Sequence, residues 1–244
     1  HYMQQHPDID FPELKEPRYF SVARLNLPQK GPGDYTVDKK LVKTWVDYEK
    51  LYSNIDNLFV GDASSEYLYN YESAIPEILE RLGDVPIILM LRNPIDRSYS
   101  AYNNLVRDGR ETRSFDEALK IEDTRKEENF DEMWHYKSVS TYSESVRAFL
   151  DSFSNVKVLV FEEFIQEKTK YINEVFEFLG VKPIKNIDTD TVYSKSGKPK
   201  AIIITVLFGR NSYIGNLLRK TAFALFGRTN IEKIGKHLMS ENES

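Results

Sequence analysis

Two side chains that could bind an anion together, Arg92 and Ser100, stand eight residues apart in the chain. The guanidinium group of an arginine presents a fixed fork of donors that suits a phosphate, through bidentate and charge-assisted hydrogen bonds. The hydroxyl group of Ser100 could donate a further hydrogen bond to the same phosphate. The spacing alone leaves a second interpretation open, in which Arg92 pairs with Asp96 and Ser100 is an ordinary helix residue.

Two further segments contain groups that could take part in chemistry. Glu16 lies in a loop between Lys15 and Pro17, where its carboxylate could accept a proton from a hydroxyl nucleophile. Most loop glutamates are simply solvated, so Glu16 alone indicates little. The segment Ser196-Gly197-Lys198 could bind a phosphate, because glycine allows close backbone approach and N–H groups can act together with the lysine. Without context, an ordinary turn explains this segment equally well.

Several classes of site are excluded by the residues themselves. The chain has no cysteine, so it can form neither a disulfide nor a thiolate nucleophile, which fits a reducing compartment. Its four histidines are widely separated and lack the spacing of metal ligands, so no metal site is expected. The sequence contains neither a Gly-x-Ser-x-Gly nucleophile elbow nor a Walker-type glycine-rich loop.

The position of Arg92 follows from the apolar run before it. Residues 87–92 predict a buried strand that ends at the arginine, and Asn93-Pro94 then begins a helix through about Arg107. In open α/β sheets, ligands bind at the carboxyl ends of the strands. Arg92 is therefore expected at the ligand-binding edge, with Ser100 on the following helix.

Further strands and helices alternate along the chain. We expect strands over 58–61 and 156–162, and the helices are expected over 37–52, 75–82, 115–128, 142–153 and 169–179. The 115–128 helix is highly charged and is expected to be exposed. This alternation predicts an α/β fold with a central parallel sheet flanked by helices. No repeat or low-complexity linker interrupts residues 1–244, so a single domain is expected.

The composition is that of a globular protein. Of the 244 residues, 41% are hydrophobic and 29% charged, and the net charge of −5 argues against general nucleic-acid binding. Nine of the basic residues, but only one acidic residue, lie between Lys195 and Lys236. This stretch could face an anionic ligand, a polyanionic acceptor or a membrane surface, or simply be a solvated helix face. No apolar run is long enough to span a bilayer, so membrane insertion of this segment is not expected.

Taken together, these segments resemble the sulfotransferases that use 3′-phosphoadenosine 5′-phosphosulfate (PAPS), in particular the carbohydrate branch related to heparan sulfate sulfotransferases. The resemblance covers nearly the whole chain. Its most specific part is the segment 91–102, which is similar to the 3′-phosphate-binding segment of the family. Other similar segments are His6-Pro7-Asp8, Lys15-Glu16-Pro17-Arg18-Tyr19-Phe20, Trp45 with Tyr48, Gly61-Asp62-Ala63-Ser64, Tyr142, Phe178-Leu179-Gly180-Val181 and Ser196-Gly197-Lys198-Pro199.

The resemblance implies a P-loop-hydrolase-like sulfotransferase fold and a role for each candidate residue. Arg92 and Ser100 would bind the 3′-phosphate of PAPS. Glu16 would be the general base that activates a hydroxyl group of a carbohydrate acceptor. Ser196, Gly197 and Lys198 would contact the donor. The reaction would be in-line transfer of a sulfuryl group, assisted by positioned cations and N–H donors.

The chain departs from the family pattern at its N-terminus. The lysine and Gly-Thr-rich loop that hold the 5′-phosphosulfate precede His-Pro-Asp in the family, and here that region would lie before His1. The C-terminus also stops where the family continues with another helix. We therefore expect a sulfotransferase domain that is truncated at both ends and has little catalytic power of its own.

Two other functions remain open on the sequence. The missing loop also favours a non-catalytic nucleotide- or glycan-binding module, which would bind adenosine 3′,5′-bisphosphate (PAP) without turnover. A phosphotransferase of the nucleotide-kinase type shares the parallel sheet but would need a Walker lysine. The acceptor and the oligomeric state are not predicted. The compartment is expected to be the bacterial cytoplasm, or the Golgi lumen if the protein is eukaryotic and its anchor lies upstream.

Overall fold

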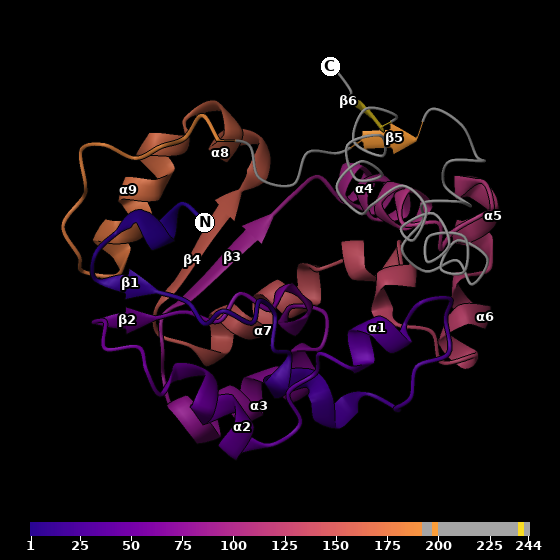
Figure 1. Ribbon diagram of the computed structural model, residues 1–244, viewed down its shortest axis with the longest axis horizontal. Helices are drawn as coiled ribbons and strands as arrows, with labels where there is room; N and C mark the ends of the chain where they lie inside the picture. Colours follow the sequence, from indigo (N-terminus) through magenta and orange to yellow (C-terminus); the bar gives the residue numbers. More distant parts are fainter. Residues whose placement is uncertain (192–196, 200–238, 242–244) are drawn as a thin grey trace, which may run out of the picture. The chain divides into compact units, whose positions relative to one another are not determined.

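The computed structural model describes residues 1–191, 197–199 and 239–241, and its elements are drawn in Figure 1. The chain divides into two compact units, which are described separately. The first unit comprises His1–Leu27, Val37–Pro94 and Thr141–Tyr193. The second comprises Pro28–Thr36, Ile95–Ser140 and the described residues after Ser194. The expected single domain stays a prediction.

The first unit contains the parallel strands and most of the helices. Its strands are β1 (Ile9–Asp10), β2 (Phe59–Val60), β3 (Ile87–Leu91) and β4 (Val156–Val160). Its α-helices are α2 (Trp45–Tyr52), α3 (Tyr71–Leu82), α7 (Ser143–Ser152), α8 (Phe161–Gln166) and α9 (Lys168–Phe178). Short 3-10 helices lie at Met3–Gln5, Tyr19–Arg24 and Ser65–Tyr67.

The strands of this unit pair in parallel, as the alternation of strands and helices predicts. β1 pairs with β2, and β3 pairs with β4 over its full length, from Ile87 opposite Val156 to Leu91 opposite Val160. Figure 1 shows β3 and β4 side by side and running in the same direction. Arg92 and Phe161 therefore each follow the last residue of a paired strand. The α/β fold with parallel strands flanked by helices is confirmed.

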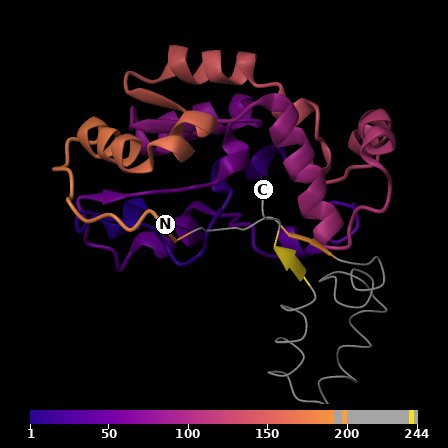
Figure 2. The same cartoon turned by 90° about the horizontal axis from the view of Figure 1, so that it is seen from above.

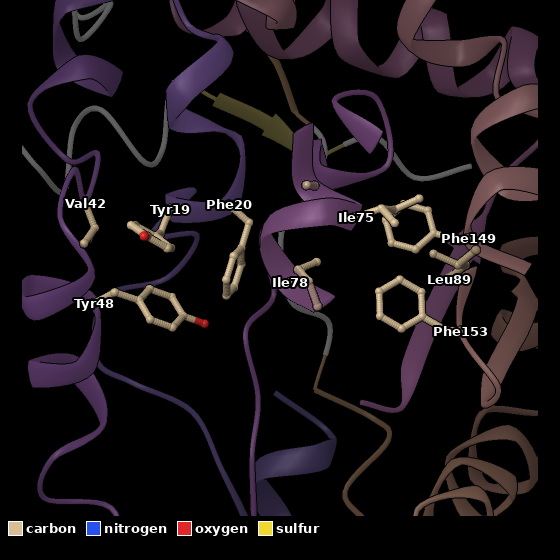
Figure 3. Close-up of a cluster of buried hydrophobic side chains, with 10 residues drawn as sticks. Tyr19, Phe20, Val42, Tyr48, Ile75, Ile78, Leu89, Phe149 and Phe153 are labelled. Carbon is tan, nitrogen blue, oxygen red and sulfur yellow. The ribbon is translucent and has the colours of Figure 1, made fainter. Parts of the chain in front are cut away.

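The main core of the first unit contains many aromatic side chains. The Tyr19 ring lies 5.2 Å from the Phe20 ring and 5.1 Å from the Tyr48 ring, measured between centroids. Figure 3 shows these three residues on one side of the cluster, with Ile75 and Ile78 between them and a second group. The second group consists of Leu89, Phe149 and Phe153. This core fixes α2, α3, α7 and β3 by burying apolar surface, which is the main source of stability.

A smaller core anchors the beginning of the chain. Ile9 of β1 packs with Ile172 and Phe176 of α9 and with Val181. The His6 ring lies 4.7 Å from the Phe176 ring, and its Nε2 atom is 2.9 Å from the carbonyl oxygen of Lys182. These contacts hold the short strand β1, whose residues lead into the loop that carries Glu16.

The second unit is built around buried ion pairs. Its helices are α4 (Pro94–Arg107, all but its first residue), α5 (Phe115–Lys120) and α6 (Glu122–Glu127), with α1 (Tyr35–Asp38) at its edge and 3-10 helices at Glu132–Trp134 and Ser138–Ser140. α4 is the long magenta helix in Figures 1 and 2. The buried carboxylate of Asp34 pairs with Arg110 and accepts hydrogen bonds from Trp134 Nε1 (3.0 Å) and from the Asp131 N–H (2.7 Å).

Two helices expected from the sequence are broken. In place of one helix over 37–52, the structure has α1 and α2, because the intervening Leu41 and Val42 turn inward and the Val42 N–H donates to the Pro17 carbonyl group (3.0 Å). Thr44 then caps α2 by accepting from the Asp47 N–H.

The expected exposure of the 115–128 helix holds for many of its charged residues but is wrong for Glu122 and Arg125. The helix is broken at Ile121, and Glu122 and Arg125 are buried. Glu122 accepts from the N–H groups of Lys137 and Ser138, while Arg125 pairs with Glu111 at 2.5 Å. The pattern of charges did not reveal these distant partners.

Candidate functional site

The loops that follow the four strands of the first unit contain two of the candidate residues, Glu16 and Arg92. β1 leads into the loop with Glu16, and β2 leads into the loop Gly61–Ser64. β3 ends directly before Arg92, and β4 ends directly before Phe161. These are the carboxyl ends of parallel strands, where ligands bind in open α/β sheets.

The guanidinium group of Arg92 lies over an aromatic ring. Its Cζ atom is 5.0 Å from the centroid of the Phe161 ring, which is within the range of a cation–π contact. Arg92 is half-buried, and its Nε atom is buried without a hydrogen-bond partner within the described residues. An unpaired buried donor is costly, and an anion that accepts from it would remove that cost.

Two long-range hydrogen bonds hold the backbone around Arg92. The Tyr142 hydroxyl donates to the Arg92 carbonyl group, and the Asn93 N–H donates to Glu162 Oε1 at 2.9 Å. The pKa of Glu162 lies below its ordinary value. The largest cause is the hydrogen bond from the Asn93 N–H, followed by the backbone N–H of Glu162 and the charge of Arg92. Glu162 is therefore ionised at neutral pH. The turn after β3 is thus fixed by Glu162 of α8 and by Tyr142, the residue before α7.

The loop with Glu16 has an unusual backbone. Glu16 and Arg18 both have left-handed φ angles, of 54° and 57°, with the buried Pro17 between them. Such angles are uncommon for residues other than glycine and persist only where the surroundings enforce them. The Glu16 side chain itself is exposed. The loop therefore presents an accessible carboxylate on a backbone held by its neighbours.

The loop after β2 is one of those neighbours. The Arg18 N–H donates to Ser64 Oγ (3.1 Å), which in turn donates to Asp62 Oδ1 (2.7 Å). Asp62 Oδ2 accepts from the hydroxyl groups of Tyr48 (3.1 Å) and Tyr67 (2.8 Å). Burial raises the pKa of Asp62, while the hydrogen bonds from Ser64, Tyr67 and Tyr48 act against that rise. This network links α2 and both loops.

A buried ion pair lies beside the same loop. Arg18 Nε is 3.4 Å from Glu66 Oε2, and the side chains are 9% and 2% exposed. The Ser21 hydroxyl is 3.3 Å from Glu66 Oε1. The pKa of Glu66 is raised to about 7, mainly by burial and also by the charges of Glu16 and Asp62, while Arg18 and a backbone N–H act to lower it. A carboxyl group of this kind can change its charge near neutral pH.

The other predicted site residues that the structure describes, Ser100, Gly197 and Lys198, belong to the second unit. Ser100 is half-buried on α4. Gly197 and Lys198 lie in a short strand, β5 (Gly197–Pro199), which is antiparallel to β6 (Met239–Glu241). The sequence predicts a loop at these residues. The strand was missed because its partner strand lies some 40 residues later and leaves no signal in the local sequence. Ser196 lies outside the described residues.

Sequence reasoning missed several residues of this site. It used Tyr142 only as a landmark, and it assigned no role to Phe161, Glu162, Arg18 or Glu66. Phe161 and Glu162 do carry one signal, because they end the predicted strand 156–162 as Arg92 ends the predicted strand 87–92. In the structure, β4 ends earlier, at Val160, and both residues begin α8. Arg18 and Glu66 carry none, since their pairing spans 48 residues. Within the described residues, no group of His, Asp and Glu side chains could hold a metal ion.

Comparisons with known proteins identify the family of this chain. Residues 75–201, slightly more than half of the chain, match the family model for the sulfotransferase domain. The chain is also similar to the crystal structure of a sulfotransferase from Alicyclobacillus acidocaldarius, with 32% identity, a TM-score of 0.75, and coverage of 89% of this chain and 88% of that one. The chain therefore belongs to the sulfotransferase family, and its fold is the sulfotransferase fold.

A second relative matches a shorter part of the chain. The membrane-associated sulfotransferase kil1 of Dictyostelium discoideum is 27% identical over 104 residues, or 42% of this chain. The match spans only 19% of the length of that protein. In the part of the present chain that the structure describes, no helix is long and apolar enough to cross a membrane.

Proposed function

We propose that this domain binds PAPS and transfers its sulfuryl group to a hydroxyl group of a carbohydrate acceptor. Membership of the sulfotransferase family supports transfer of a sulfuryl group. The donor, the acceptor class and the residue roles are the proposal. In this reaction the acceptor oxygen forms a bond to sulfur, the bond from sulfur to the donor phosphate breaks, and PAP leaves with that electron pair.

The main support for the proposed donor site comes from the surroundings of Arg92. Its guanidinium group lies over Phe161 at the carboxyl end of β3, and its buried Nε has no partner within the described residues. Phosphate oxygens are the acceptors that a guanidinium fork binds best. These features fit the 3′-phosphate of PAPS, with Ser100 as a second donor to the same group. The donor contacts proposed for Ser196, Gly197 and Lys198 follow from the resemblance to the family alone.

Glu16 is the proposed general base. Its exposed carboxylate would take the proton of the acceptor hydroxyl as the new oxygen–sulfur bond forms. Support comes from the left-handed backbone at Glu16 and Arg18, because strained backbone of this kind gathers at functional sites. The proposed acceptor is a carbohydrate because the segment 15–20 resembles the carbohydrate branch of the family.

The first experiment measures binding of PAP by calorimetry to the wild-type chain and to the Arg92→Ala variant. Loss of a bidentate, charge-assisted contact is expected to weaken binding by at least about 10-fold. Arg147→Ala is the matched control, because Arg147 is an exposed arginine on α7 of the same unit. Unchanged affinity in Arg92→Ala would exclude the proposed 3′-phosphate site.

The second experiment measures turnover of the full-length protein with PAPS and a carbohydrate acceptor. Glu16→Gln should abolish sulfuryl transfer while leaving PAP binding intact. Glu49→Gln, which changes an exposed glutamate on α2, should leave both unchanged. Normal turnover in Glu16→Gln would remove Glu16 as the base. PAP binding without any turnover in the wild-type protein would favour the non-catalytic binding module.

A further inference from the structure

We propose that Glu66, acting through Arg18, is a positioning residue that holds Glu16 in the place where it accepts the proton of the acceptor. This inference rests on the proposed function, because it assumes that Glu16 is the base. It gives a role to Arg18, which lies in the segment 15–20 but was assigned none, and to Glu66, which lies outside the segments from which the roles were predicted.

The backbone of the Glu16 loop needs an external restraint. Left-handed φ angles at two non-glycine residues cost free energy, of order 1 kcal/mol or more each. Two hydrogen bonds restrain the loop from outside: the Val42 N–H donates to the Pro17 carbonyl group (3.0 Å), and the Arg18 N–H donates to Ser64 Oγ (3.1 Å). Both hydrogen bonds hold the two residues that directly follow Glu16. They therefore restrict the direction in which the Glu16 side chain projects from the loop.

The Arg18 side chain supplies the third restraint. It is buried, and its Nε atom lies 3.4 Å from the carboxylate of Glu66. Glu66 belongs to the 3-10 helix Ser65–Tyr67, which follows directly after Ser64. The same short segment therefore holds Arg18 twice, by its backbone through Ser64 and by its side chain through Glu66. Two attachments fix the orientation of the residue, whereas one would leave rotation free.

Stability alone is a poor explanation for this pair. Burying two charges costs several kcal/mol per ion, and apolar residues of similar volume often stabilise a protein as well or better. A close contact between two buried charges does, however, restrict the movement of both side chains, and a proton acceptor in an in-line reaction requires a restricted position. The location beside a strained loop with an exposed carboxylate therefore favours a positioning role.

The charges around Glu66 also connect it with Glu16. The groups that act on its carboxyl are the cation of Arg18 and the carboxylates of Glu16 and Asp62, together with its own burial. The pKa of Glu66 is about 7, so the carboxyl takes up a proton as the pH falls through neutrality. Protonation removes the charge that holds Arg18. The position of Glu16 should then depend on pH in the range where Glu66 titrates.

The test compares the pH dependence of kcat/KM for the full-length wild type with that of Glu66→Gln. The wild type should lose activity as the pH falls through about 7. Glu66→Gln, a neutral isostere, should show kcat reduced about 10- to 100-fold at all pH values, no inflection near 7 and unchanged PAP affinity. Glu49→Gln should behave as the wild type. A Glu66→Gln profile that superimposes on the wild-type profile would overturn the proposal.

The Glu16→Gln variant separates this proposal from the proposed function. If Glu16→Gln abolishes turnover while Glu66→Gln has the wild-type profile, Glu16 is the base and the positioning role is wrong. If Glu16→Gln keeps normal turnover, the assigned base is wrong and the positioning role is overturned with it.

An NMR titration of the 244-residue chain tests the coupling without turnover. The carboxyl carbon of Glu66 is followed with pH in the wild type, in Arg18→Gln and in Glu16→Gln. Loss of the Arg18 cation should move the titration to higher pH, and loss of the Glu16 charge should move it to lower pH. An unchanged titration in both variants would contradict the proposal. Glu16 is exposed, so its substitution should not prevent folding.

Discussion

At the scale of single residues, Arg92 owes its position to partners that are far away in the sequence. Tyr142 binds its carbonyl group, Phe161 lies under its guanidinium, and Glu162 binds the next N–H group. The sequence could indicate Arg92 itself, because it ends an apolar run and begins an Asn-Pro turn. It could not indicate these contacts, since they depend on the pairing of β3 with β4 and on the course of the chain before α7.

The Tyr142→Phe variant tests whether this support matters for binding. Removing the hydroxyl leaves the Arg92 carbonyl group without its donor, which should cost about 1 kcal/mol of stability and weaken PAP binding about 3- to 10-fold. Chemical denaturation and calorimetry measure the two effects. Tyr171→Phe is the control, because it removes a hydroxyl that binds Glu163 on the exposed surface (2.8 Å). Full PAP affinity in Tyr142→Phe would show that Tyr142 has no part in donor binding.

At the scale of elements, the strands were easier to predict than the helices around them. β3 is a continuous apolar run, β4 is apolar except for Lys157, and their parallel pairing follows from the alternation of strands and helices. β1 has only two residues and was not predicted, because a two-residue strand has no periodicity. The helix over 37–52 was predicted as one piece because the apolar residues at its centre fit a helix as well as they fit the buried link that the structure shows.

The close packing of β1 and β2 is testable at Gly61. Its N–H donates to the Asp10 carbonyl group (2.9 Å), and a Cβ atom at this position would overlap the Phe11 ring. Gly61→Ala should therefore destabilise the protein by about 1–3 kcal/mol through overpacking. It should also disturb the Glu16 loop, which continues from Phe11. Thermal denaturation and chemical denaturation measure the loss.

Gly83→Ala separates overpacking from backbone strain. A Cβ atom at Gly83 meets open space, but its φ angle of 77° disfavours other residues. This variant should lose about 1 kcal/mol through strain alone. Gly61→Ala should lose more. An equal or smaller loss at Gly61 would contradict the tight packing between the two strands.

At the scale of the whole molecule, buried titratable groups make the stability depend on pH. Glu66 has a folded pKa of about 7, above its ordinary value, so the folded state binds more protons than the unfolded state between pH 4.5 and 7. Glu66 therefore lowers stability as the pH rises through this range. His135 acts in the opposite sense, because burial lowers its pKa to about 4 and stability rises with pH between about 4 and 6.5.

Comparison of the wild type with Glu66→Gln isolates the effect of Glu66. Between pH 5 and pH 8, the wild type should lose about 1–3 kcal/mol of unfolding free energy relative to the variant. Urea denaturation at several pH values measures both curves, and the contributions of His135 and Asp34 cancel in the difference. Parallel curves would mean that the pKa of Glu66 does not differ between the folded and unfolded states.

The overall class of the protein could be predicted from the sequence, since residues 75–201 match the sulfotransferase family and the fold agrees with the expected one. The buried ion pairs of the chain could not be predicted from the sequence. Two examples are the pair of Arg18 with Glu66, which lie 48 positions apart, and the pair of Asp34 with Arg110, which lie 76 positions apart. In the sequence, each of these side chains resembles an ordinary surface charge. Buried charges of this kind become visible only when the fold brings their partners together.

The most direct measurement of the proposed function is transfer of radiolabelled sulfate from PAPS to a polysaccharide by the full-length protein. The wild type should yield a sulfated polysaccharide and PAP in equal amounts. Arg92→Ala should require far more PAPS for the same rate, and Glu16→Gln should form no product while still binding PAP. A wild-type protein that binds PAPS but labels no hydroxyl-bearing acceptor, or an Arg92→Ala variant with unchanged dependence on PAPS, would contradict the proposal.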